Sequence, residues 1–173
     1  MAAFVLLVAC APTPVAGTPG APGVGDPYFP LDGNGGYDVQ DYRLEVAYDP
    51  VTDVLIGTTT IRARATQDLS AFNLDLSGLE VREVTVNDAP ATATRAGDEL
   101  TITPAAPLAL NSEFAAVIRY GGVPRTIHDQ FGVSGFFHTD DGALVVGQPD
   151  VAATWYPVND HPVSYTHLTL PTN

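Results

Sequence analysis

The segment Tyr42-Arg43-Leu44-Glu45-Val46-Ala47-Tyr48-Asp49 decides the fold class, because its large apolar residues recur at every second position. A period of two places these side chains on one face, which is typical of a half-buried antiparallel strand. The sequence Asp49-Pro50-Val51-Thr52-Asp53 predicts a turn, since proline presets φ and aspartate can cap the turn. We therefore expect a β-hairpin whose return strand spans residues 54–65.

The same alternation continues at short intervals along the chain. Its apolar members are Phe72, Leu74 and Leu76, then Val84 and Val86, then Phe114, Ala116, Ile118 and Tyr120. Turn signals stand at Asn87-Asp88-Ala89-Pro90, Ala96-Gly97-Asp98 and Asp140-Asp141-Gly142. No window of a dozen residues has the period of an amphipathic helix. The predicted fold is all-β, a curved antiparallel β-sandwich or saddle that is incomplete at its C-terminal end.

Composition narrows the class of partner. The chain has 173 residues, with 7 Lys+Arg against 20 Asp+Glu and a formal net charge of −13. This acidic balance argues against a nucleic-acid partner, because phosphate binding needs a basic face. Hydrophobic residues make up 45% of the chain, a level typical of globular domains. A single cysteine excludes an internal disulfide framework and a Cys-rich zinc module.

The N-terminus predicts the location of the protein. Residues 1–10 read as a lipoprotein signal peptide, in which an apolar run ends in Leu7-Val8-Ala9-Cys10 and resembles a bacterial lipobox. Cys10 would become the lipidated first mature residue, although no basic residue precedes the apolar run. Residues 11–36 contain thirteen Gly or Pro in 26 positions, which predicts a tether. We expect an extracellular or cell-surface protein, attached to the membrane only through its lipid anchor.

The chain carries no complete active site of its own. The histidines His128, His138, His161 and His167 form no H-E-x-x-H motif, and the sequence lacks a G-x-S-x-G elbow and a P-loop. His128 is interpreted as a loop histidine and Asp140-Asp141 as a solvated hairpin tip. Trp155-Tyr156 is interpreted as core packing in preference to a ligand platform.

Two blocks of sequence carry a family resemblance. The first runs Tyr37-Asp38-Val39-Gln40-Asp41-Tyr42-Arg43-Leu44-Glu45-Val46, followed by Leu74-Asp75-Leu76 and Leu79-Glu80-Val81. The second is Gly135-Phe136-Phe137 followed by Gly147-Gln148-Pro149-Asp150-Val151-Ala152-Ala153-Thr154-Trp155-Tyr156-Pro157-Val158-Asn159-Asp160-His161-Pro162. Together they resemble the N-terminal domain of peptidase family M1, the zinc aminopeptidases of the aminopeptidase N type. Val158 and His161 depart from the usual Cys and Glu, at positions that are not catalytic in that family.

The resemblance implies a division of labour within a larger enzyme. Residues 37–163 would form the non-catalytic N-terminal β domain of a secreted zinc metalloaminopeptidase, a hydrolase that releases N-terminal residues from peptides. Zinc and the catalytic residues would lie in a following thermolysin-like domain, so this chain alone would be inactive and bind no metal. Gln148 and Asp150 would line the first specificity pocket and approach the substrate's free α-amine. A carboxylate and an amide oxygen suit that cation chemically.

The end of the chain departs from this pattern. Residues 164–173 carry no charge and do not continue the family sequence. This predicts a non-native tail at the end of a truncated gene sequence. An alternative class stays open, namely a stand-alone lipid-anchored extracellular β-sandwich that acts as a binding module. A structural spacer domain is a third. The block from Gln148 to Pro162 favours the peptidase interpretation, because neither of the other classes needs it.

Overall fold

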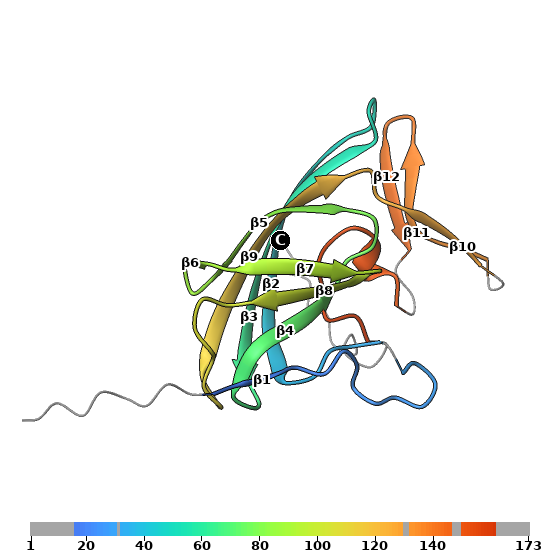
Figure 1. The fold of residues 1–173 in the computed structure, drawn as a ribbon. Coiled ribbons are helices and arrows are strands. Elements are labelled where there is room, and N and C mark those ends of the chain that lie inside the picture. Colours follow the sequence, from blue (N-terminus) through green and yellow to red (C-terminus); the bar gives the residue numbers. More distant parts are fainter. Residues whose placement is uncertain (1–15, 31, 130–131, 147–149, 162–173) are drawn as a thin grey trace, which may run out of the picture.

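The computed structural model describes residues 16–30, 32–129, 132–146 and 150–161. The described residues form twelve strands and one short 3-10 helix, grouped in three sheets (Figure 1). The all-β fold predicted from the alternating pattern is confirmed. Among these described residues, no helix has the length and apolar character needed to span a membrane.

The largest sheet is built around the predicted hairpin. Its order is β2 (Tyr37–Asp49), β3 (Val54–Ala65), β9 (Glu113–Gly122), β5 (Glu80–Val86) and β6 (Ala89–Pro90), and every neighbouring pair is antiparallel. Strand β3 has the predicted bounds. Asn87 and Asp88 form the β5–β6 turn with φ of 50° and 63°, a left-handed conformation that Asn and Asp tolerate better than most residues.

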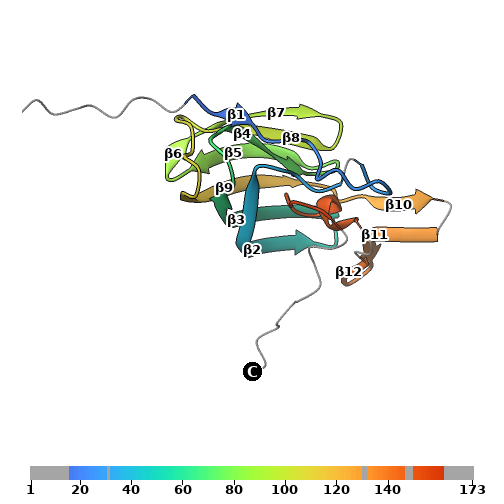
Figure 2. The same cartoon turned by 90° about the horizontal axis from the view of Figure 1, so that it is seen from below.

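A four-stranded sheet covers one face of the five-stranded sheet. Its order is β1 (Thr18–Pro19), β4 (Leu69–Asp75), β8 (Glu99–Thr103) and β7 (Thr92–Ala96). Figure 2 shows the two sheets as stacked layers. Side chains from both layers form one buried core, with Phe72, Leu74 and Ile102 from the smaller sheet and Ile61, Ile118 and Tyr120 from the larger. This arrangement is the expected sandwich.

A third sheet projects from one end of the sandwich (Figure 1). It consists of β10 (Thr126–Asp129), β11 (Gly132–Thr139) and β12 (Gly142–Val146), and we call it the arm. The interpretation of His128 as a loop histidine is wrong, because this exposed residue pairs with Val133 inside β10. A strand of only four residues is too short for its period to stand out in the sequence.

The Gly/Pro-rich N-terminal segment differs from the expected tether over its described residues. The Thr18 amide donates to the Asp68 carbonyl at 2.8 Å, and the Gly20 amide donates to the Ala71 carbonyl at 2.8 Å. Glycine makes this close approach possible, since a Cβ at Gly20 would lie 3.5 Å from the Ala71 oxygen and closer still to Gly35. Residues 16–30 and 32–36 therefore belong to the β domain. Cys10 lies outside the described residues.

Candidate functional site

The segment 150–161 runs beside the end of β4 and is fixed to it. Asp75 and Val158 exchange two backbone hydrogen bonds of 2.7 and 3.1 Å, and the Ser77 amide donates to the Ala153 carbonyl at 2.8 Å. The intervening 3-10 helix η1 (Ala152–Thr154) is buried along its whole length. These contacts fix the segment against the end of β4, and Asp150 is the first residue of this segment.

Aromatic packing holds the far end of the same segment. Tyr156 is buried and packs edge-on against Tyr42, with ring centroids 6.1 Å apart. The Asn159 amide donates to the Tyr42 hydroxyl at 2.9 Å. Burial raises the pKa of that hydroxyl, so it stays protonated. The expectation of core packing is confirmed for Tyr156, while Trp155 is half-buried.

A cavity of about 630 Å³ opens between the end of β4, the β7–β8 turn and η1. Its lining includes six carboxylic acids: Asp32, Asp75, Asp98, Glu99, Asp150 and Asp160. The Arg125 guanidinium reaches the edge of this region and donates to the Ser77 hydroxyl at 3.2 Å. So many acids in one hollow favour a cationic ligand with N–H donors over an anionic one.

Asp75 lines this acidic cavity and is held by two hydrogen bonds. Its Oδ2 accepts hydrogen bonds from the Asn34 side-chain amide at 3.0 Å and from the Asp160 backbone amide at 2.8 Å. Burial raises the pKa of Asp75 to about 7, and the neighbouring carboxyl groups of Glu99 and Asp160 act in the same direction. Asp75 is therefore a structural acid that holds a proton below neutral pH.

The N-terminal segment adds a carboxyl group beside Asp150. Burial and the nearby charge of Asp150 together raise the pKa of Asp32 to about 6. A cation bound between the Asp32 and Asp150 carboxyl groups would offset the repulsion that raises the pKa of Asp32. The structure thus brings residue 32, in the expected tether, next to residue 150, in the expected amine site.

A reciprocal amide pair positions this N-terminal loop. The Asn34 backbone amide donates to Asn159 Oδ1 at 2.6 Å, and Asn159 Nδ2 donates to the Asn34 carbonyl at 3.0 Å. The Gly33 amide donates to the Asp160 carbonyl at 2.6 Å. Asp26 Oδ2 also lies 3.4 Å from His161 Nε2. The loop and the segment 150–161 therefore form one hydrogen-bonded unit around the cavity.

The two predicted substrate-binding residues have different outcomes. Asp150 lines the acidic cavity, while Gln148 lies outside the described residues. Sequence reasoning missed Asp32 and the structural role of Asp75. The Leu74-Asp75-Leu76 pattern marks Asp75, since a carboxyl between two buried leucines needs hydrogen-bond partners. Asp32 has no comparable signal, because a Gly-rich context masks its contact with a segment more than a hundred residues away.

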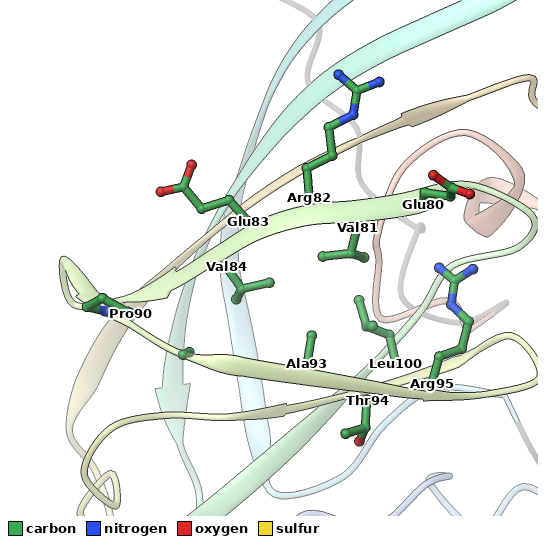
Figure 3. Close-up of a pocket in the computed structure, with 11 residues that line it drawn as sticks. Glu80, Val81, Arg82, Glu83, Val84, Pro90, Ala93, Thr94, Arg95 and Leu100 are labelled. Carbon is green, nitrogen blue, oxygen red and sulfur yellow. The ribbon is translucent and has the colours of Figure 1, made fainter.

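A second hollow, of about 650 Å³, lies between β5 and the β7–β8 hairpin (Figure 3). Val81, Val84 and Ala93 point into it, whereas Arg82 points away. Glu80 and Arg95 approach each other at its edge, so it lacks the single sign of charge found around Asp75. It is a gap between two sheet edges, and the acidic cavity is the better candidate for a site.

The described residues offer no place for a resident metal ion. No group of three or more His, Cys, Asp or Glu side chains within ranges 16–30, 32–129, 132–146 and 150–161 is arranged to hold one. The carboxyl groups of Asp75 and Asp160 are instead engaged with backbone and side-chain amides.

Comparisons with known proteins identify the class of this domain. Solved structures of M1 zinc metallopeptidases share its fold. The structure from Deinococcus radiodurans bound to a Tyr-Ser-Ala substrate is 26% identical, with a TM-score of 0.72, and the match covers 80% of this chain and 33% of that one. A two-domain M1 zinc metallopeptidase bound to L-arginine is 27% identical, with a TM-score of 0.73 and the same coverage. A further Deinococcus radiodurans structure is 26% identical with a TM-score of 0.71, covering 80% of this chain and 32% of that one.

The resemblance stated from the sequence is thereby confirmed: this chain is similar to the N-terminal domain of M1 zinc metallopeptidases. It spans about a third of the length of the metallopeptidases it matches. No protein-family profile matches the chain, and no curated protein matches it either.

Proposed function

We propose that this chain is the non-catalytic N-terminal domain of a zinc metalloaminopeptidase and contributes to the pocket that binds the substrate's N-terminus. The observation that carries the proposal is the acidic cavity at Asp150, on a domain similar in fold to M1 zinc metallopeptidases. Two of those metallopeptidases are bound to a tripeptide substrate and to L-arginine, both of which carry a free α-amine. The same class of ligand suits this cavity.

Asp150 would accept hydrogen bonds from the substrate ammonium group, together with Gln148. The pairing is stronger in a partly enclosed cavity than in water, because the local dielectric constant is lower. Peptide-bond hydrolysis would be carried out by a zinc-bound water in the catalytic domain, which is the partner of this domain. The role of the residues described here is to hold the N-terminus and to exclude substrates that lack a free amine.

The test starts from the reading frame downstream of Val163. We expect an H-E-x-x-H motif with a later Glu, and an expressed product that releases Tyr from Tyr-Ser-Ala but leaves the N-acetylated peptide intact. Asp150→Asn should lower kcat/KM roughly 10- to 100-fold, as expected for a hydrogen bond to a charged group. Asp98→Asn, which alters a carboxyl on the same cavity, is the matched control and should change kcat/KM little. Absence of both the motif and the activity would overturn the proposal in favour of the binding module.

We further propose that the parent enzyme is a cell-surface protein anchored through lipid at Cys10. The support is the apolar run that ends in Leu7-Val8-Ala9-Cys10. Metabolic labelling with an alkyne fatty acid should label the wild-type protein and leave Cys10→Ser unlabelled. Equal labelling of the two proteins would contradict a lipid anchor at this cysteine.

A further inference from the structure

Three polar side chains join the arm to the β2–β3 hairpin. The Tyr48 hydroxyl lies 2.8 Å from Asp53 Oδ1 and 2.8 Å from His138 Nδ1. His138 Nδ1 also lies 3.1 Å from Asp53 Oδ1, which closes a triangle. Tyr48 is the next-to-last residue of β2, Asp53 is in the turn, and His138 belongs to β11, so the triangle links two different sheets. Figures 1 and 2 show the turn of the β2–β3 hairpin beside the arm.

Counting protons in the triangle identifies the form of His138 that fits. His138 Nε2 lies 3.1 Å from the Pro124 carbonyl oxygen, which can only accept, so Nε2 carries a proton. The Tyr48 hydroxyl has one proton, and Asp53 can accept it. No proton is then left to point at Nδ1, so Nδ1 can hydrogen-bond to the two oxygens only if it carries a proton as well. The doubly protonated imidazolium satisfies every contact.

A neutral ring leaves the same triangle unsatisfied. If Nε2 keeps the only ring proton, the Nδ1 lone pair faces Asp53 Oδ1 at 3.1 Å. Tyr48 can then donate to His138 or to Asp53, and whichever acceptor it leaves faces a lone pair. Asp49 adds a further negative charge near Tyr48, and its carboxylate is bound to Val51 and Thr52 in the turn. The acids on the hairpin thus favour a positive charge on β11.

Aromatic side chains beside the triangle form a second contact between the arm and the β2–β3 hairpin. Phe136, on the same strand as His138, packs against the Tyr48 ring with centroids 5.2 Å apart. The rings of Phe136 and His138 are 5.4 Å apart. The His138 side chain is 26% exposed, so a proton can reach it from solvent. The apolar contact is independent of pH, whereas the polar contact depends on the His138 proton.

We propose that His138 is a pH-dependent latch between the arm and the β2–β3 hairpin. As imidazolium, His138 holds the arm against the hairpin through Asp53 and Tyr48. As neutral imidazole it no longer makes these contacts, and the arm opens more often. Histidine charge changes in the physiological pH range, so the latch would respond to mildly acidic and mildly alkaline surroundings. β12 ends at Val146, four positions before Asp150. The latch does not depend on the proposed amine site. If that site is correct, the latch also controls how rigidly the segment that begins at Asp150 is held.

Amide hydrogen exchange on the full chain tests the latch. Protection of the arm is compared at pH 5.5 and pH 8, corrected for intrinsic exchange and expressed relative to β3 and β9. We expect arm protection to fall roughly two- to fivefold on going to pH 8, the range appropriate to a partly exposed ion pair. His138→Gln and Asp53→Asn should each abolish the change, and Asn tolerates the left-handed conformation of residue 53.

His128→Gln is the matched control. His128 is an exposed histidine on β10 of the same arm, so this variant should retain the full pH dependence. Unchanged arm protection in the wild type between the two pH values would overturn the latch. So would a pH dependence in His138→Gln equal to that of the wild type, because another group would then be responsible.

Discussion

The Asp75→Asn substitution should make the domain more stable at pH 8. It removes a carboxylate whose ionised form is less favourable in the folded protein than in the unfolded chain. Asp75 Oδ2 accepts from Asn34 Nδ2 at 3.0 Å and from the Asp160 amide at 2.8 Å. The asparagine oxygen can accept both hydrogen bonds in the same place. The substitution therefore removes charge while keeping shape and partners.

The magnitude follows from the pKa of Asp75, which burial raises from 3.8 to about 7. The native state then keeps a proton between pH 4 and pH 7 that the unfolded chain releases. Stability falls with rising pH wherever the native state binds more protons, so the domain loses stability across this window. At about 1.4 kcal/mol for each pKa unit the limit is roughly 4 kcal/mol, and coupling to Glu99 and Asp160 reduces the expected gain in Asp75→Asn to about 1–3 kcal/mol.

Urea unfolding at pH 4.5 and pH 8 measures this effect directly. The two proteins should differ less in free energy of unfolding at pH 4.5 than at pH 8, where the variant should be the more stable. Asp98→Asn, on the rim of the same cavity and exposed, is the control for a general loss of negative charge. The reasoning fails if Asp75→Asn keeps the wild-type pH dependence, or if Asp98→Asn gains as much at pH 8.

Three further predictions concern packing, the N-terminal loop and association. Gly57→Ala should lower the free energy of unfolding by roughly 1–3 kcal/mol in urea titrations, because the new Cβ would lie 2.8 Å from Cε2 of the fully buried Tyr120 ring. Asn159→Ala should speed hydrogen exchange in residues 16–36 while leaving β3 unchanged, since it removes both side-chain hydrogen bonds to Asn34. We expect self-association through the exposed apolar side chains of the arm, and Leu144→Ser should reduce it in sedimentation velocity at little cost in stability, because Leu144 is 59% exposed on β12.

The fold class could be predicted from the sequence because its signal is local. The alternation from Tyr42 to Tyr48 and the turn after Asp49 define a hairpin within about twenty residues, and β3 occupies the predicted range. For the Gly/Pro-rich segment, by contrast, the sequence prediction and the structure differ. Its many glycines predict a flexible tether, whereas at Gly20 the missing side chain allows the backbone to lie against β4 and the loop around Gly35. Composition alone does not separate these two uses of glycine.

The candidate site could be predicted only in part, because it is assembled from distant segments. Asp150 came from the family resemblance, and the structure places it in an acidic cavity. Asp32 reaches the same cavity through contacts at residues 33 and 34 with residues 159 and 160, which no sequence period encodes. Long-range hydrogen bonds of this kind depend on the completed sandwich.

Most residues of the family motif in the block from residue 150 to residue 161 have structural roles. Ala152, Tyr156 and Val158 are buried, and they pack η1 and the following chain into the sandwich. The Asp160 carboxylate accepts from the Ala153 amide at 3.0 Å, so it too is engaged in holding this segment. Folding alone therefore accounts for the aromatic-Pro-x-x-Asp pattern. Amine binding is proposed for Asp150, which lines a cavity rich in carboxyl groups. Substitution of this residue should alter substrate recognition while the sandwich stays folded.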